Sequence, residues 1–243
     1  MFKHLIDVQE EQQEVIANLR GYADLEIVRY SGGVQCSTED IVNELVGHLP
    51  YLVDVNLYSR FFIPIVTPTN ALVSYVLFDS INYFKRKNFD ENLGVYFLPK
   101  QKKNIYVPAL AWEQVLSSEF VGVVDGVWDA VYLNYVGFPA ISIMQSSFGK
   151  NVVEILRCWK TLYIFSDSDA AGASLYQSAV ELFPNCFRVT TPTKDIDEFL
   201  KLYGKTEFYK QFKFSFNTQL KIPKNQDREV VSPVMVQKRV FTL

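Results

Sequence analysis

The chain has 243 residues, of which 49% are hydrophobic and 21% charged, and its formal net charge is -3. These values are typical of a globular protein with a buried core, and they exclude wholesale disorder and a uniformly basic surface for nucleic acid. The three cysteines and two histidines lie far apart in the sequence, so we expect a reducing compartment and no zinc finger or ribbon. Because the sequence has neither a signal-peptide pattern nor an apolar run long enough for a membrane span, we expect a cytoplasmic protein without membrane contact.

Charge is unevenly distributed along the chain. Residues 81–110 and 201–243 are net positive, whereas residues 1–50 and 111–200 are strongly negative. The near-zero total is therefore compatible with a local basic patch beside an acidic site.

The first half of the chain is predicted to be a mixture of helices and strands. Apolar residues at near-helical spacing ahead of Gly21 predict a first helix, and acids after Thr38 predict the start of a second helix over residues 41–46. Two apolar runs, residues 61–66 and 72–78, are joined by Pro68-Thr69-Asn70 and predict a β-hairpin. Residues 94–98 and 105–107 are expected to be further short strands.

From about residue 119 the pattern changes to alternating strands and helices. This alternation predicts βαβ units and a parallel sheet. The expected strands are residues 120–124, 140–144, 161–165 and 186–190, and the expected helices are residues 128–136, 152–159, 170–183 and 196–203.

Acidic side chains follow three of the predicted strands. Asp125 follows the first strand, Asp167 and Asp169 follow the third, and Asp195 and Asp197 follow the fourth. Since ligands of open parallel sheets bind at the carboxyl ends of the strands, we expect these carboxylates to lie close together around a hard divalent cation. Taken singly, Asp125 or Asp195 would be explained equally well as a helix N-cap.

Three segments together resemble the signature of the TOPRIM domain. They are Asp-Gly-x-x-Asp at residues 125–129, Ser-Asp-Ser-Asp-Ala-Ala-Gly at residues 166–172 and Lys-Asp-Ile-Asp-Glu-Phe-Leu at residues 194–200. Upstream, Arg-Phe-Phe-Ile-Pro-Ile at residues 60–65 and the lysine-containing residues 96–106 are similar to segments of bacterial-type, DnaG-like primases. The resemblance covers about residues 55–202. It departs from the family at Asp125, where TOPRIM domains usually have Glu.

The resemblance implies an α/β fold, with a TOPRIM core whose central parallel sheet is flanked by helices and is preceded by a smaller mixed α+β subdomain. The implied divisions are residues 1–115 for the N-terminal subdomain, 116–203 for the TOPRIM domain and 204–243 for a C-terminal extension. Residues 220–243 are expected to be either a tail on the domain or a docking peptide.

The resemblance also implies a set of functional residues. Asp125, Asp167 and Asp169 would be catalytic, and together with Asp195 and Asp197 they would bind Mg²⁺ or Mn²⁺, with no zinc. Basic residues would bind the template or the incoming nucleotide, although a solvated loop would explain the clustered lysines equally well: Arg60, Lys85, Arg86, Lys102, Lys103 and Lys194.

The function implied is that of a primase core, which makes short RNA primers on single-stranded DNA from ribonucleoside triphosphates. No zinc-binding module precedes the core, so we expect a compact phage-like version that works in the host cytoplasm with a replicative helicase or another replisome protein. Two alternatives stay open. One is a TOPRIM nuclease, and the other is a non-catalytic replisome subunit, which the Asp at position 125 favours.

Overall fold

The computed structural model describes residues 10–48, 57, 60–79, 95–96, 105–167 and 169–219. The chain divides into two compact units, Met1–Leu202 and Tyr203–Leu243, and each is considered by itself. The expected boundary at residues 115 and 116 lies inside the first unit and stays a prediction. No described helix is both long and apolar enough to cross a membrane.

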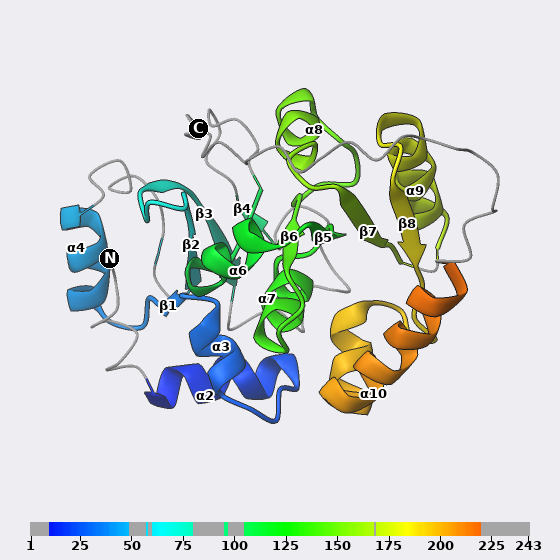
Figure 1. The fold of residues 1–243 in the computed structure, drawn as a ribbon. Helices are drawn as coiled ribbons and strands as arrows, with labels where there is room; N and C mark the ends of the chain where they lie inside the picture. The colour runs from blue at the N-terminus through cyan, green and yellow to red at the C-terminus, as the bar shows by residue number, and fades with distance from the viewer. Residues whose placement is uncertain are drawn as a thin grey trace. The chain divides into compact units, whose positions relative to one another are not determined.

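The first half of the larger unit contains an antiparallel sheet with strand order β1-β2-β3-β4 (Figure 1). The predicted hairpin is confirmed, and Asn70 in its turn has a φ of 62°. Helix α3 and strand β1 were not predicted, and α4 is longer than the residues 41–46 expected. The elements are α2 (Glu10–Arg20), α3 (Glu26–Tyr30), β1 (Val34–Gln35), α4 (Glu39–His48), β2 (Arg60–Val66), β3 (Leu72–Asp79) and β4 (Val95–Tyr96).

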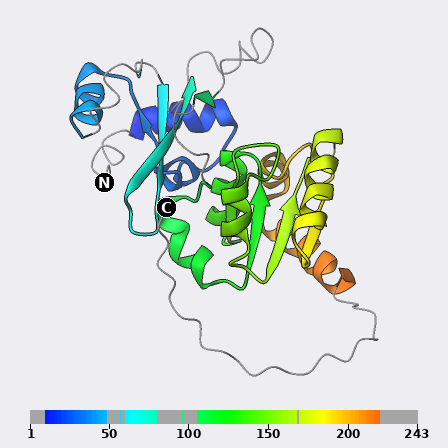
Figure 2. The same cartoon turned by 90° about the horizontal axis from the view of Figure 1, so that it is seen from above.

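The second half is the predicted parallel sheet flanked by helices, with strand order β6-β5-β7-β8 (Figure 2). The α/β fold class is therefore confirmed. The strand expected over residues 105–107 is wrong, because Tyr106 makes only an isolated bridge to Ser142. The elements are η2 (Ala109–Ala111), α6 (Trp112–Ser117), β5 (Phe120–Val124), α7 (Val127–Tyr135), β6 (Ala140–Ser142), α8 (Lys150–Leu156), β7 (Thr161–Phe165), α9 (Ala170–Leu182), β8 (Cys186–Val189) and α10 (Ile196–Gln219).

Helix α7 joins the two halves, because it is buried on more than one face. It contacts β5 and β6 of the parallel sheet. On another face the ring of Trp128 stacks on Phe61 of β2, with centroids 5.9 Å apart, and packs against Phe78 of β3. Six of its nine residues are buried, including Trp128, Val131 and Leu133. The position of α7 matters for function, since the turn before it carries Asp125.

Two tryptophans fix the helices around the parallel sheet. The indole of Trp112 in α6 donates a hydrogen bond to the carbonyl of Val66 at the end of β2, at 3.0 Å. The indole of Trp159, after α8, donates to the carbonyl of Val115 at 2.9 Å. Both side chains belong to one apolar core cluster, which also includes residues of β5, β7 and α9.

Helix α10 spans the boundary between the two units. Its conformation is broken at Gly204, whose φ of 72° and ψ of 176° are not helical. The helix predicted over residues 196–203 is therefore present, but a further helical segment follows it that was not predicted. In that segment the rings of Phe208 and Phe212 pack with centroids 4.0 Å apart. Residues 220–243, expected to be a tail or docking peptide, lie outside the described residues.

Candidate active site

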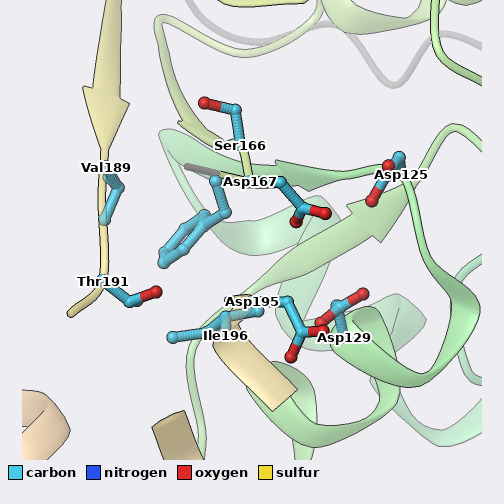
Figure 3. Close-up of a pocket in the computed structure, with 9 residues that line it drawn as sticks. Asp125, Asp129, Ser166, Asp167, Val189, Thr191, Asp195 and Ile196 are labelled. Carbon is cyan, nitrogen blue, oxygen red and sulfur yellow. The ribbon is translucent and has the colours of Figure 1, made fainter. Parts of the chain in front are cut away.

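A pocket lies at the carboxyl ends of the parallel strands, and four carboxylates line it. The carboxylates belong to Asp125, Asp129, Asp167 and Asp195. The other lining residues are Phe165, Ser166, Val189, Thr191 and Ile196. Figure 3 shows the four carboxyl groups directed toward a common space. Three of the acids predicted from the sequence are thus brought together, as expected for residues that follow neighbouring strands of one sheet.

Asp125 begins the turn between β5 and α7 and is not a helix N-cap. Gly126 occupies the N-cap position of α7. The hydroxyl of Ser142, at the end of β6, donates to the carbonyl oxygen of Asp125 at 2.8 Å and fixes the turn. Although Asp125 is exposed at the pocket rim, desolvation of its carboxylate raises its pKa, and the charges of Asp195 and Asp169 raise it further.

Asp167 follows β7, and its backbone is held tightly by the helix that comes next. A Cβ on Gly172 of α9 would lie 2.1 Å from the carbonyl oxygen of Asp167, so α9 approaches this turn more closely than a side chain at position 172 would allow. Desolvation raises the pKa of Asp167 to about 6, and Asp125, Asp195 and Asp169 contribute in the same direction.

Asp169 has a structural contact of its own in the same turn. It is the N-cap of α9, where its Oδ1 accepts a hydrogen bond from the backbone N–H of Gly172 at 2.8 Å. Asp169 is not among the pocket-lining residues, but its charge contributes to the raised pKa values of Asp125 and Asp167. Its expected role as a metal ligand stays a prediction.

Asp129 is the acid that the sequence prediction missed. It lies in the first turn of α7, and its Oδ2 is so close to Gly126 that a Cβ there would lie 2.2 Å from it. Desolvation raises the pKa of Asp129 to about 8, and the charges of Asp197, Asp195 and Asp125 add to this. The second acid of Asp-Gly-x-x-Asp was the available signal.

Asp195 both lines the pocket and caps α10. Its Oδ1 accepts from the N–H of Glu198 at 2.8 Å, while the side chain of Glu198 accepts from the N–H of Lys194 at 3.0 Å. This reciprocal arrangement is similar to a capping box. The N-cap explanation of Asp195 is therefore right, and it is compatible with a position on the pocket wall.

Asp197 is a predicted site residue whose side chain the structure engages away from the pocket. It is buried, with 5% of its surface exposed, and is absent from the pocket lining. Its carboxylate instead forms ion pairs with Arg20 and Lys201.

Arg188 of β8 is a further residue that the sequence did not single out. Its Nε donates to the hydroxyl of Ser166 at 2.9 Å, and its Nη2 donates to the carbonyl of Asp167 at 3.2 Å. The guanidinium therefore helps to hold the turn that carries Asp167.

Comparison with known proteins identifies the fold. No protein-family profile matches the sequence, and no curated protein is similar to it. Among solved structures, the RNA polymerase domain of Mycobacterium tuberculosis primase DnaG covers 90% of this chain and is covered over 83% of its own length, with a TM-score of 0.67 and 16% identity. The fold is that of a DnaG primase catalytic core.

Two further structures with the DnaG core fold are similar. A DnaG primase catalytic domain bound to single-stranded DNA covers 90% of this chain and 82% of its own, with a TM-score of 0.62 and 17% identity. The Aquifex aeolicus primase, comprising zinc-binding and RNA polymerase domains, covers 86% of this chain with a TM-score of 0.66 and 20% identity, but the chain spans only 57% of that structure. At these identities the likeness shows the DnaG fold.

The basic residues predicted to bind nucleic acid are only partly described. Lys194 is exposed beside the pocket, and its positive charge opposes the raised pKa of Asp167. Arg60 begins β2 in the antiparallel sheet and does not line the pocket. The other four, Lys85, Arg86, Lys102 and Lys103, lie outside the described residues.

The donor set of the pocket fits a hard divalent cation. All of its charged groups are carboxylates, and their mutual repulsion contributes to the raised pKa values of Asp125, Asp129 and Asp167. Within the described part of the chain, no group of three or more acidic, histidine or cysteine side chains is close enough to enclose a metal alone. A site with one or two carboxylate ligands would need water and substrate phosphates to complete the shell of a cation such as Mg²⁺.

Proposed function

We propose that this chain is the catalytic core of a DNA primase, which synthesises short RNA primers on single-stranded DNA by Mg²⁺- or Mn²⁺-dependent nucleotidyl transfer. One observation carries the proposal. In a chain with the DnaG core fold, Asp125, Asp167 and Asp195 follow three adjacent parallel strands, β5, β7 and β8, and line one pocket. Residues 116–203 would be the TOPRIM domain and residues 1–115 the N-terminal subdomain.

Each group of pocket residues would have a separate role. One or two carboxylates among Asp125, Asp167 and Asp195 would hold the divalent cation, with water and substrate phosphates completing its shell and Asp169 beside them. When bound, the cation would supply polarisation of the attacking 3′-hydroxyl and of the α-phosphate. The raised pKa of Asp129 favours the neutral form of its carboxyl group while no cation is bound. Lys194 would offset charge on the triphosphate.

The nucleic-acid partners are proposed from the basic residues and from the comparison. The similar DnaG domain is bound to single-stranded DNA. We expect Arg60, Lys85, Arg86, Lys102, Lys103 and Lys194 to contact template phosphates or the incoming ribonucleoside triphosphate, because such contacts provide most of the affinity for nucleic acid. A replicative helicase is the proposed protein partner.

A priming assay tests the proposal. The protein is incubated with single-stranded DNA, labelled ribonucleoside triphosphates and Mg²⁺ or Mn²⁺, and the labelled products are separated by length. We expect short RNA products, which Asp167→Asn reduces by about 100-fold or more, because the substitution removes a charged metal ligand. The matched control is Asp40→Asn, an exposed acid in the first turn of α4, which should leave priming unchanged.

Two results would contradict the proposal. Full priming by Asp167→Asn would show that the pocket is not the site of the reaction. Cleavage of labelled single-stranded DNA without nucleotides, lost in Asp167→Asn, would identify a nuclease instead. Absence of both activities in the folded wild-type protein would favour the non-catalytic replisome subunit.

A further inference from the structure

The carboxylate of Asp197 is the centre of a buried ionic cluster. Its Oδ2 accepts from Nη2 of Arg20 at 2.8 Å and from Nζ of Lys201 at 2.5 Å. Its Oδ1 accepts from the hydroxyl of Tyr22 at 2.8 Å. Only 7% of the Asp197 side chain is exposed, so both oxygens are satisfied by protein donors away from water. A carboxylate engaged in this way has little capacity left for a metal ion.

Aromatic rings complete the cluster. The guanidinium of Arg20 lies 5.2 Å from the ring centroid of Trp128, and the ammonium of Lys201 lies 4.7 Å from that of Tyr22. The rings of Tyr22 and Trp128 are themselves in contact, with centroids 5.7 Å apart. Cations over aromatic faces are attracted more strongly when they are desolvated. The cluster therefore joins the end of α2, the first turn of α7 and the first turn of α10.

The same residue reaches the pocket through its backbone. The N–H of Asp197 donates to Oδ1 of Asp129 at 3.1 Å, and Asp129 lines the pocket. Asp195, two residues earlier, lines it too. The contacts of the Asp197 side chain thus determine the orientation of the turn that carries Asp195. They also determine the direction of the Asp197 N–H, which donates to Asp129.

We infer that Asp197 is a positioning residue and not a metal ligand: with Arg20, Tyr22 and Lys201 it anchors the start of α10 to the N-terminal helix α2, and this anchor holds Asp129 and Asp195 at the pocket. The inference deepens the proposed function and rests on it, since the geometry that is held is that of the proposed metal site. By this inference, Arg20 and Tyr22 of the N-terminal segment contribute to the geometry of the proposed metal site.

Mn²⁺ binding, followed by electron paramagnetic resonance in the absence of nucleotide and DNA, separates a positioning residue from a ligand. Arg20 has no oxygen to offer a metal. If it acts through Asp197, Arg20→Met should raise the Mn²⁺ dissociation constant by about tenfold, the lower limit typical of lost outer-sphere support. Asp197→Asn should have a similar effect. The double variant should be little worse than either single variant, because both break the same anchor.

Milder variants keep the test decisive if Arg20→Met does not fold. Arg20→Lys retains the charge and should retain most of the Mn²⁺ affinity. Tyr22→Phe removes one hydrogen bond to Asp197 and should weaken Mn²⁺ binding less than Arg20→Met. The matched control is Lys160→Met, which removes a cation from an exposed pair with Glu119, where the side chains are 74% and 75% exposed, and should leave the Mn²⁺ affinity unchanged.

The outcomes distinguish this inference from the proposed function. If the wild-type protein binds Mn²⁺ but Arg20→Met and Tyr22→Phe bind it as tightly as wild type, while Asp197→Asn alone loses it, Asp197 is a ligand and the inference is wrong. If the folded wild-type protein binds no Mn²⁺, the proposed metal site itself is wrong. Coupled losses in Arg20 and Asp197 variants support the anchor whether or not primers are made.

Discussion

The pocket and the Asp197 cluster are two acidic regions that share one short segment, because Asp195 lines the pocket and Asp197 lies two residues later. The environments of their carboxylates are opposite. At the pocket, desolvation and the charges of neighbouring carboxylates raise the pKa values of Asp125, Asp129 and Asp167. In the cluster, Asp197 is paired with two cations and a hydroxyl. The protein neutralises the buried carboxylate that supports the fold, whereas the pocket carboxylates are the ones that we propose for a divalent cation.

This contrast explains how one short segment serves both purposes. Asp195 is the N-cap of α10 and Asp197 follows in its first turn, so their side chains leave the helix in different directions. One direction leads to the ends of the parallel strands and the other to α2. The four predictions below break or sharpen the contrast, from the largest expected effect on stability to the smallest.

Breaking the cluster should have the largest effect. Asp197→Ala leaves Arg20 and Lys201 buried without their anion, with 16% and 20% of their side chains exposed, and should lower the free energy of unfolding by about 3–5 kcal/mol. Asp125→Ala removes an uncompensated pocket charge and should cost far less. Chemical denaturation of both variants, with EDTA present, measures the difference. Equal losses would contradict the contrast.

The backbone of Asp167 tolerates no side chain at position 172. In Gly172→Ala the added Cβ would lie 2.1 Å from the Asp167 carbonyl oxygen and 2.7 Å from its nitrogen, so the turn or α9 must shift. We expect a loss of about 2–3 kcal/mol, as for overpacking of a core, and weaker Mn²⁺ binding. Gly47→Ala is the control, because a Cβ there meets nothing within 4 Å. Wild-type stability of Gly172→Ala would be the contrary result.

The pocket acids should make the metal-free protein less stable as the pH rises. The pKa of Asp129 is raised to about 8 and that of Asp167 to about 6, so the folded state retains protons that the unfolded chain releases near pH 4. Their stabilising contribution is complete below about pH 4 and is lost as the pH rises through 6 and then 8. We expect the free energy of unfolding of the metal-free protein to decrease continuously between about pH 5 and pH 9.

Asp129→Asn isolates the main part of that pH dependence. The amide cannot ionise, and its oxygen can still accept from the N–H of Asp197. Urea denaturation in EDTA at several pH values should show a flatter profile for this variant than for wild type. A profile as steep as that of wild type would show that Asp129 is already ionised in the folded protein at neutral pH.

The smallest effect is expected at Arg188. Arg188→Met removes two hydrogen bonds, to the Ser166 hydroxyl and the Asp167 carbonyl, and should cost about 1 kcal/mol because both acceptors are neutral and only partly buried. Arg188→Lys keeps the charge without the forked geometry and should recover part of the loss. Thermal unfolding measures both. A variant more stable than wild type would contradict a supporting role for Arg188.

The elements of the parallel half were more predictable from the sequence than those of the first half, because their apolar pattern is more regular. Strands β5 and β7 match their predicted bounds because each is a continuous apolar run that precedes an amphipathic helix. Helix α3 has five residues and β1 has two, too few for a periodic pattern to be recognised. The apolar residues 105–107 were predicted as a strand, but their burial comes from the core around α6 and β2.

The candidate site was predictable to the extent that its residues follow strands. Asp125, Asp167 and Asp195 were expected together for that reason. The opposite orientation of Asp197 was not predictable, because its partners Arg20 and Tyr22 lie more than 170 residues away in the chain. Asp129 was overlooked for a similar reason. Its place in the pocket depends on how closely its carboxylate approaches Gly126 in the folded turn.

The most direct test of this account is a crystal structure of the protein with Mn²⁺ and a ribonucleoside triphosphate, in which anomalous scattering locates the metal. The account predicts Mn²⁺ bound by carboxylates among Asp125, Asp167 and Asp195, with phosphate oxygens completing its shell. It also predicts that Asp197 is still paired with Arg20 and carries no metal. Mn²⁺ on Asp197, or no metal beside Asp125 and Asp167, would contradict it.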